Sequence, residues 1–150
     1  MPHSHASLLT HVVFSTKERK PLLNGDLPER LFPYMRQTAR KYSGEIHIVD
    51  GAADHVHLLI SLPTNRSLAE IMRVVKCNSS RWVRVEFPDR QDFGWQNGYA
   101  AFSVSHSMRS AVYRYIERQR EHHKVHSFQE EFIALLRKHQ IEYDERYVWT

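Results

Sequence analysis

DHVHLLISLP, residues 54–63, includes the stretch from His55 to Leu62 that predicts the centre of the fold. This stretch is mostly aliphatic and contains no Asp, Glu, Lys or Arg, as expected of a buried strand. Side chains alternate along a strand, with Val56, Leu58 and Ile60 on one face and His55, His57, Leu59 and Ser61 on the other. If the aliphatic face packs against helices, both histidines point to the uncovered face of a sheet.

Two more strands and a helix are predicted upstream of this stretch. Ala6 to Ser15 is rich in β-branched and aromatic residues, and Glu45 to Val49 joins the central strand through DGAAD, a connection of hairpin length. Between them, apolar residues at helical spacing predict a helix over Asp26 to Tyr42, with Gly44 at its C-terminal cap. Pro33 does not suit a helix interior, so we expect a kink or a later start.

The clearest helix lies downstream of the central strand. Ser67 and Glu70 form a capping box, and the apolar face that follows ends at Pro88. A fourth strand and two C-terminal helices are predicted over Tyr99–Ser105, Ser107–His122 and Ser127–His139.

The order strand, helix, strand, strand, helix, strand predicts an α+β, ferredoxin-like (RRM-like) fold. This fold has a four-stranded antiparallel sheet with two helices on one face, and its first and third strands are central. The two C-terminal helices are appended to it. A chain of 150 residues suits one domain, residues 1–150, with enough buried surface to need no covalent staple.

Basic residues are unevenly distributed. The chain has 21 Lys and Arg against 17 Asp and Glu, a formal charge of +4. The segment from Arg66 to Arg90 holds six basic and three acidic residues, and His106 to His126 holds five and two. Such stretches favour a polyanionic partner, although two solvated helix faces would give the same composition. The candidate nucleic-acid contacts are Lys17, Arg19, Arg73, Lys76, Arg81, Arg109 and Arg118.

Composition excludes several classes of protein. Cys77 is the single cysteine and cannot form an internal disulfide, and no apolar run approaches the roughly 18 residues of a membrane span. No basic region precedes an apolar stretch at the start, so no signal peptide is predicted. The 41% hydrophobic content argues against disorder. We expect a cytoplasmic protein in a reducing compartment, with no membrane partner.

His55 and His57 are the first candidate site. Two residues apart on a strand, they share a face and can bind one metal ion through two imidazoles. The alternative is a pair of half-buried histidines hydrogen-bonded to neighbours. His11, on the neighbouring central strand, is interpreted as a satisfied polar residue rather than a further ligand.

Tyr115 and Gln119 form the second candidate group. They lie four residues apart on a predicted helix and share a face, whereas Tyr113 points elsewhere. A tyrosine that continues an apolar face commonly belongs to the core. If this face meets the histidines, the phenol can attack phosphorus, a metal on the imidazoles can withdraw charge from phosphate oxygens, and the Gln119 amide oxygen can complete the metal site.

At these residues the sequence resembles the single-tyrosine HUH transposases, which are the TnpA-type transposases of small insertion sequences and the REP-associated tyrosine transposases. The family has a histidine, hydrophobic residue, histidine motif on a central strand, here His55-Val56-His57, and a later helix with a tyrosine and a polar metal ligand four residues on, here Tyr115 and Gln119. The resemblance spans nearly the whole chain and includes THVVFSTKERKPLL, SLAEIMRVVK, WQNGYAAFSVS and SFQEEFIALLRKHQIEYDERYVW.

The resemblance implies a DNA transposase and single-strand endonuclease that depends on Mg²⁺ or Mn²⁺. Such enzymes hold the 5′ side of the cleaved strand as a phosphotyrosine while a 3′-hydroxyl leaves, and rejoin it to another 3′-hydroxyl. Tyr115 would be the nucleophile, and His55, His57 and Gln119 the metal ligands, with His122 or His123 as alternatives to Gln119. The implied partners are single-stranded, hairpin-containing element ends and a second copy of the chain, in a homodimer whose active sites are completed in trans.

Three other functions are compatible with part of this pattern. An RNA-binding module of the same fold would carry aromatic residues on the open face, where His55 and His57 stand instead. A phosphoesterase with two histidine motifs would need a second internal motif. A non-catalytic nucleic-acid-binding protein derived from a transposase is the stronger alternative, but it would have no need of Tyr115 and both histidines.

Overall fold

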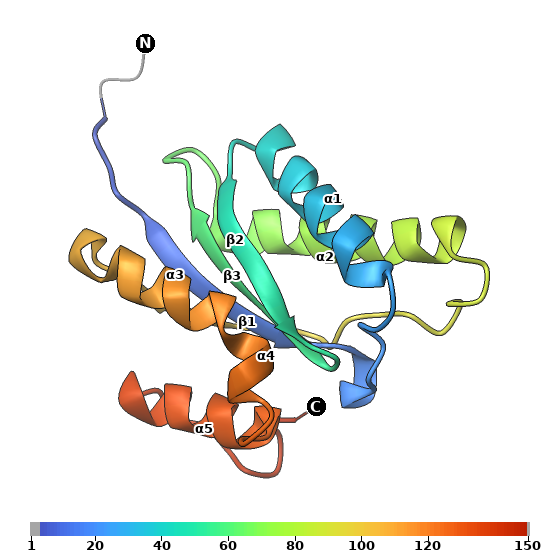
Figure 1. Cartoon of the computed structure of the whole chain (residues 1–150). Coiled ribbons are helices and arrows are strands. Elements are labelled where there is room, and N and C mark those ends of the chain that lie inside the picture. Colours follow the sequence, from blue (N-terminus) through green and yellow to red (C-terminus); the bar gives the residue numbers. More distant parts are fainter. Residues whose placement is uncertain (1–3, 150) are drawn as a thin grey trace.

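The computed structural model describes residues 4–149 and contains a four-stranded antiparallel sheet with the strand order β2-β3-β1-β4 (Figure 1). The elements up to the fourth strand are β1 (Leu9–Ser15), η1 (Lys17–Arg19, a 3-10 turn), α1 (Leu27–Lys41), β2 (Glu45–Ala52), β3 (His55–Ser61), α2 (Leu68–Glu86) and β4 (Ala100–Ser103). The central strands β1 and β3 pair with His57 opposite Val13. The predicted α+β fold and the central position of the histidine strand are confirmed.

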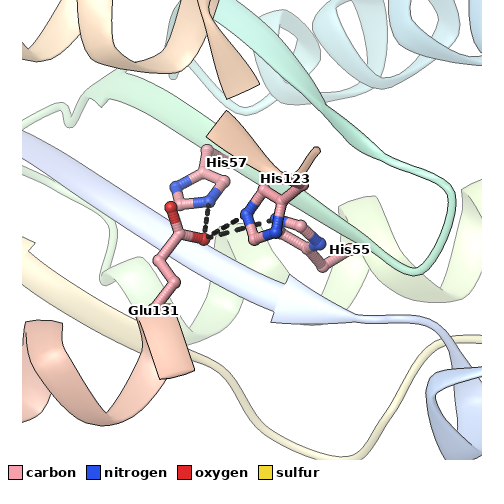
Figure 2. A group of neighbouring side chains, drawn as sticks. All are labelled: His55, His57, His123 and Glu131. Atoms are coloured by element: carbon pink, nitrogen blue, oxygen red, sulfur yellow. Dashed lines mark hydrogen bonds and ion pairs between the residues drawn. The ribbon is translucent and has the colours of Figure 1, made fainter. Parts of the chain in front are cut away.

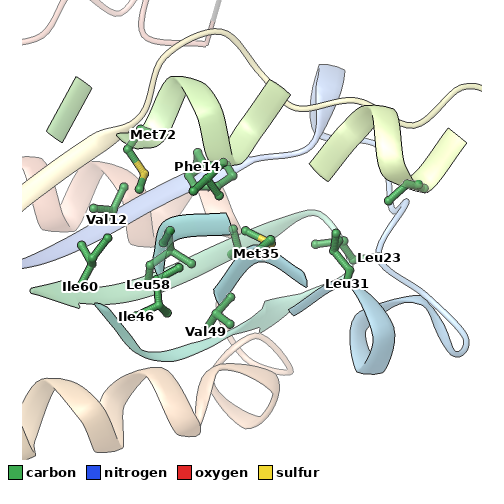
Figure 3. Packing of buried hydrophobic residues seen from close by; sticks show 14 of the residues in the cluster. Val12, Phe14, Leu23, Leu31, Met35, Ile46, Val49, Leu58, Ile60 and Met72 are labelled. Carbon is green, nitrogen blue, oxygen red and sulfur yellow. The ribbon is translucent and has the colours of Figure 1, made fainter. Parts of the chain in front are cut away.

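Helices α1 and α2 cover one face of the sheet (Figure 1). Val56, Leu58 and Ile60 are fully buried on this face. They belong to a core that includes Met35 of α1 and Met72 of α2, and Figure 3 shows Leu58 and Ile60 in this core. Burying one such side chain contributes about 1.5–3 kcal/mol, and a register slip of one residue would turn the whole set to the opposite face of the sheet. The aliphatic layer therefore fixes which residues of β3 point away from α1 and α2, and these include both histidines.

The β2–β3 hairpin is tighter than the sequence indicates. β2 continues through Asp50 and Gly51 to Ala52, which pairs with His55, so a two-residue turn replaces the expected DGAAD connection. At Gly51 a Cβ atom would lie 2.1 Å from the carbonyl oxygen of His55, so only glycine allows this approach of the two strands. The hairpin sets His55 at the first position of β3.

Two helix starts follow the sequence. Ser67 accepts a hydrogen bond from the backbone N–H of Glu70 at 3.1 Å, which confirms the predicted cap of α2. α1 begins at Leu27 with Asp26 as its N-cap, in agreement with the predicted range, and runs through Pro33. Of the two expected consequences of Pro33, a kink or a later start, the later start is wrong. Pro33 is exposed, and on that side water can bond the carbonyl group that loses its helical partner. Within residues 4–149, none of the helices has both the length and the hydropathy that a membrane crossing requires.

The opposite face of the sheet is covered rather than open. η2 (His106–Met108), α3 (Arg109–Glu117), α4 (Gln119–His122) and α5 (Phe128–Lys138) lie over it (Figure 1). The single helix predicted over Ser107–His122 is wrong, because the backbone leaves helical geometry at Arg118, with φ −97° and ψ 14°. The expected uncovered histidine face is therefore corrected: the C-terminal helices of the same chain bury it.

Candidate active site

His55 and His57 meet two residues of the C-terminal region beneath these helices. Both histidines are fully buried, with ring centroids 5.2 Å apart. His123, just after α4, and Glu131 of α5 point toward them (Figure 2). One ring nitrogen of each histidine and one oxygen of Glu131 all lie within 4.8 Å of one another. We call these four residues the histidine cluster.

Glu131 is the residue on which the cluster converges. Its Oε1 atom accepts hydrogen bonds from Nε2 of His57 at 2.9 Å and Nε2 of His123 at 2.9 Å, and lies 3.4 Å from Nε2 of His55. The Glu131 side chain is only 2% exposed. A buried carboxylate is costly unless charged or polar partners surround it, and this one is surrounded.

Tyr115 and Gln119 contact the other oxygen of the same carboxylate. The Tyr115 hydroxyl donates to Oε2 of Glu131, and the Gln119 amide donates to that oxygen at 2.9 Å. Oε1 of Gln119 lies 3.2 Å from Nε2 of His55. The Tyr115 ring centroid is 5.7 Å from that of His57 in the same chain. The break at Arg118 thus leaves the predicted tyrosine and glutamine together beside the predicted histidines.

Two further residues hold the strand histidines in place. Nδ1 of His55 contacts Oδ1 of Asp54 at 2.8 Å, and Nδ1 of His57 contacts Nε2 of His11 at 2.8 Å. Such partners fix the ring orientation and leave Nε2 of both His55 and His57 directed at Glu131. His11 is therefore a partner of His57 outside the cluster, in line with its interpretation as a satisfied polar residue.

The environment separates the pKa values of the two strand histidines. Burial would lower the pKa of His55, but hydrogen bonds with Asp54 and Glu131 outweigh burial and raise it to about 9. Burial dominates at His57 and lowers its pKa to about 4. Burial alone would raise the pKa of Glu131, but its bonds with the histidines hold it well below the usual range. At neutral pH an ionised Glu131 therefore faces a protonated His55 and a neutral His57.

The phenol is held in its protonated form. Burial, followed by the hydrogen bond to Glu131, raises the pKa of Tyr115 above its ordinary value. Tyr115 is half-buried, so it can meet both the cluster and a molecule arriving from solvent. A phenol of this kind needs positive charge nearby before it becomes an effective nucleophile.

The donors of the cluster suit a divalent metal ion. Imidazole nitrogens and a carboxylate oxygen are common metal ligands, and the cluster places His55, His57, His123 and Glu131 within reach of one ion. Metal ligation requires unprotonated imidazole nitrogens, so an ion would replace the protons that now bridge to Glu131. The cluster could therefore bind either protons or a metal.

Sequence reasoning missed Glu131 and named His123 only as an alternative ligand. One signal for Glu131 was available: Phe128, Phe132 and Leu136 form the buried face of α5, and Glu131 lies on that face. An acidic residue on the buried face of an amphipathic helix requires a polar partner. His123 carries no such signal, because it follows α4 in an irregular segment.

The predicted nucleic-acid contacts do not form one surface. Arg73, Lys76 and Arg81 lie on α2, on the far side of the sheet from the cluster, whereas Arg109 and Arg118 lie at the two ends of α3. Lys17 and Arg19 lie in η1. Any strand that follows the basic residues must therefore pass around an edge of the sheet.

Several of these side chains already have contacts within the chain. Lys76 donates to the carbonyl oxygens of Gln96, at 2.7 Å, and Gly98, and burial lowers its pKa to about 8. The guanidinium carbon of Arg19 lies 5.2 Å from the ring centroid of Trp149. Arg73 and Arg118 are exposed and are better placed to meet a phosphate.

Comparison with known families identifies the chain. Residues 4–119 match the family described as IS200-like transposases, which is well over half of the sequence. The chain belongs to the IS200-like transposase family. The matched part of this transposase contains His55, His57, Tyr115 and Gln119, whereas His123 and Glu131 lie beyond it.

Two relatives of this transposase illustrate the match. ISDra2 transposase TnpA from Deinococcus radiodurans is 27% identical over 116 residues, which cover 74% of this chain and 83% of the relative. The transposase for insertion sequence element IS200 from Salmonella typhimurium is 25% identical over 130 residues, 83% of this chain and 85% of the relative.

Solved structures share the fold of this transposase. A protein from Deinococcus radiodurans R1 described as a transposase superposes with a TM-score of 0.65 at 23% identity, over 80% of this chain and 96% of that one. A REP-associated tyrosine transposase bound to a REP hairpin gives a TM-score of 0.55 at 11% identity, over 79% of this chain and 70% of that one.

Proposed function

We propose that this transposase cleaves and rejoins single-stranded DNA at element ends through a covalent 5′-phosphotyrosine on Tyr115. The observation that carries the proposal is the placement of the Tyr115 hydroxyl on Glu131, the residue that also contacts His55, His57 and His123. A phenol that merely filled a core would not need a buried carboxylate and three imidazoles beside it. The membership in the IS200-like family supports the same chemistry.

The reaction is a transfer of the phosphoryl group from one oxygen to another. Tyr115 Oη attacks phosphorus, the bond from phosphorus to the 3′-oxygen breaks, and the 3′-oxygen leaves as a hydroxyl after taking up a proton. The phenol loses its proton as the new bond forms, and Glu131 Oε2, its hydrogen-bond acceptor, is the atom placed to receive it. Rejoining is the reverse: a 3′-hydroxyl attacks the phosphotyrosine and restores the phenol.

The residues present fit a divalent metal, for which we propose Mg²⁺ or Mn²⁺. His55 and His57 would hold it, with Glu131, His123 and Gln119 as the available further ligands. A bound divalent ion would withdraw charge from the phosphate oxygens and supply the positive charge that a tyrosine with a raised pKa needs. The high proportion of imidazole suits Mn²⁺ better than Mg²⁺, which favours oxygen ligands.

The assembly of the active site is the second part of the proposal. The resemblance implies a homodimer completed in trans, in which the tyrosine of one chain serves the histidines of the other. The geometry of the single chain favours a site completed in cis, because Tyr115 already contacts Glu131 and lies beside His57 of its own chain. We therefore propose that each chain can carry a complete site whether or not it dimerises.

The partner is proposed to be a single strand with a hairpin, taken from the DNA that flanks the gene. A labelled strand of this sequence is incubated with the protein and Mn²⁺ or Mg²⁺. A label at the 5′ end is expected to appear in a shortened product with a 3′-hydroxyl, and a label at the 3′ end in a covalent protein adduct. The same sequence as a duplex should not be cleaved. Tight binding of the strand without either product would instead support the non-catalytic nucleic-acid-binding alternative.

A further inference from the structure

A groove leads away from Tyr115 between α3 and α5. It has a volume of about 920 Å³, and Tyr115 and Glu131 form part of its wall. Ala111 and Val112 of α3 face Ala134 and Leu135 of α5 across it. Phe102 of β4 also lines it. We call this space the α3–α5 groove.

The lining of the α3–α5 groove is mainly apolar. Met108 is 49% exposed beside it, and Val104 and Val112 are half-buried. The ring of Phe102 stacks on that of His139, with centroids 4.2 Å apart and planes 25° apart. Apolar and aromatic walls with a few polar groups are typical of a pocket that takes a flat organic group.

The lining of most of this space does not favour phosphate. The side chains of Glu131 and Glu130 both line the groove, and the carboxylate of Glu130 lies 3.6 Å from His126. Two acidic side chains disfavour a second phosphate next to the one that meets Tyr115. The only part of a DNA strand with an uncharged, flat and largely apolar surface is the base, which stacks readily on side chains of this kind.

The spacing along α5 also suits a nucleotide. Lys138 lines the groove seven positions after Glu131, which is roughly 10 Å along a helix that rises about 1.5 Å per residue. The exposed ammonium group of Lys138 can therefore meet a backbone phosphate beyond the groove. The hydroxyl groups of Ser103 and Ser105, which also line the groove, are available to the polar edge of a base.

From these observations we propose that the α3–α5 groove binds one unstacked base of the strand, at a nucleotide flanking the phosphate that Tyr115 attacks. The proposal rests on the proposed function, since it takes Tyr115 as the point where the backbone enters. It assigns to α5, which lies beyond the residues matched by the family, a direct part in selecting the cleavage position.

The test fills the groove from an exposed helix position. Ala134→Trp places a large side chain in the groove, and Ala134 is exposed, so the helix can accept the change. Gln129→Trp is the matched control, because Gln129 is an exposed residue of the same helix outside the groove lining. Each change is made in full-length protein carrying Tyr115→Phe, which allows binding without cleavage.

Binding is measured by fluorescence anisotropy with labelled single strands copied from the flanking DNA, each with one abasic nucleotide at a successive position. At one position next to the cleavage site, loss of the base should weaken binding about 10-fold, within the range known for base stacking on protein side chains. Ala134→Trp should weaken binding of the intact strand by a similar factor and that of this abasic strand no further. Gln129→Trp should leave the pattern unchanged.

The groove proposal would be overturned if the losses of affinity caused by Ala134→Trp and by an abasic nucleotide were additive at every position. It would also be overturned if no abasic position weakened binding. If Ala134→Trp alters the circular dichroism spectrum, Ala111→Trp on the facing wall replaces it. The proposed function is read separately, from the covalent adduct formed by chains with Tyr115 intact. If the adduct forms but the effects of Ala134→Trp and of every abasic position are additive, only the groove proposal is contradicted. If the effects at one position are non-additive but no adduct forms, only the cleavage activity is contradicted.

Discussion

Nε2 of His57 lies 2.9 Å from Oε1 of Glu131, although the two residues are 74 positions apart in the sequence. An imidazole nitrogen that donates to a carboxylate carries a proton, and a metal ligand requires the same nitrogen without it. At neutral pH His57 is already neutral, so its ring proton need only move from Nε2 to Nδ1, whereas the protonated His55 must lose a proton before it can bind a metal. Metal affinity is expected to increase with pH, and metal binding should release protons to the buffer.

The first prediction concerns metal affinity. Glu131→Gln should weaken Mn²⁺ binding by about 10-fold or more, because it removes the charge on which the three imidazoles converge. His57→Ala should abolish it, while DNA affinity changes far less, since DNA binding is mainly electrostatic. Isothermal titration of chelator-treated protein with Mn²⁺ measures the metal affinity. Glu117→Gln, at an exposed position of α3, is the control. Equal Mn²⁺ affinity in all four proteins would contradict the metal site.

The second prediction is that the metal-free chain is most stable near pH 6.5. Burial lowers the pKa of His57 to about 4 and that of His11 to about 3, so below pH 6.5 the unfolded chain binds protons that the folded chain does not, and stability falls. Despite burial, bonds with Asp54 and Glu131 raise the pKa of His55 to about 9. Its contribution is therefore complete below pH 6.5 and is lost as the pH rises through 9.

Urea denaturation in the presence of a chelator, at acidic, near-neutral and alkaline pH, measures this profile. His11→Asn should flatten the acidic side and His55→Asn the alkaline side, because each removes one of the groups whose pKa changes on folding. A stability that rises steadily from pH 6.5 to 9 would show that His55 does not hold its proton in the folded chain.

The third prediction concerns subunit mixing. If Tyr115 serves its own histidines, His57→Ala and Tyr115→Phe proteins should stay inactive together, because no chain then holds a complete site. If the sites are completed in trans, random exchange makes half of the dimers mixed, each with one intact site, and activity should recover to roughly a quarter of wild type. We expect no recovery. Cleavage by the mixture, with exchange shown by mass spectrometry, would establish the trans arrangement.

Much of the fold is predictable because period-two and helical patterns act locally. The stretch from His55 to Ser61 is aliphatic on one face and mainly polar on the other, and the capping box at Ser67 marks the start of α2, so both elements lie where the sequence places them. The break in the helix at Arg118 could not be predicted, because no proline or glycine lies at this position. It arises where the chain turns to bring Gln119 under the sheet, a tertiary constraint that no local pattern contains.

The site was predictable in part for the same reason. His55 and His57 share a strand, and Tyr115 and Gln119 share a spacing, so each pair could be found within a few residues of sequence. Glu131 could not be found in this way, because its partners in the site lie on other elements of the fold. The sequence predicts its helix only as an addition to the sheet and does not indicate where that helix packs. The contacts of Glu131 depend on α5 packing over β1 and β4, which places Phe102 and Phe132 in one cluster.

The most direct test of the central claim is the covalent adduct on Tyr115, measured by denaturing gel after incubation with the labelled flanking strand and Mn²⁺. Tyr115→Phe removes one oxygen and keeps the ring, so it should abolish both cleavage and adduct while leaving the circular dichroism spectrum and DNA affinity nearly unchanged. Tyr113→Phe, two residues earlier on the same helix, should be close to wild type. An adduct that persists in Tyr115→Phe, or one that is lost in Tyr113→Phe instead, would contradict the assignment of Tyr115 as the nucleophile.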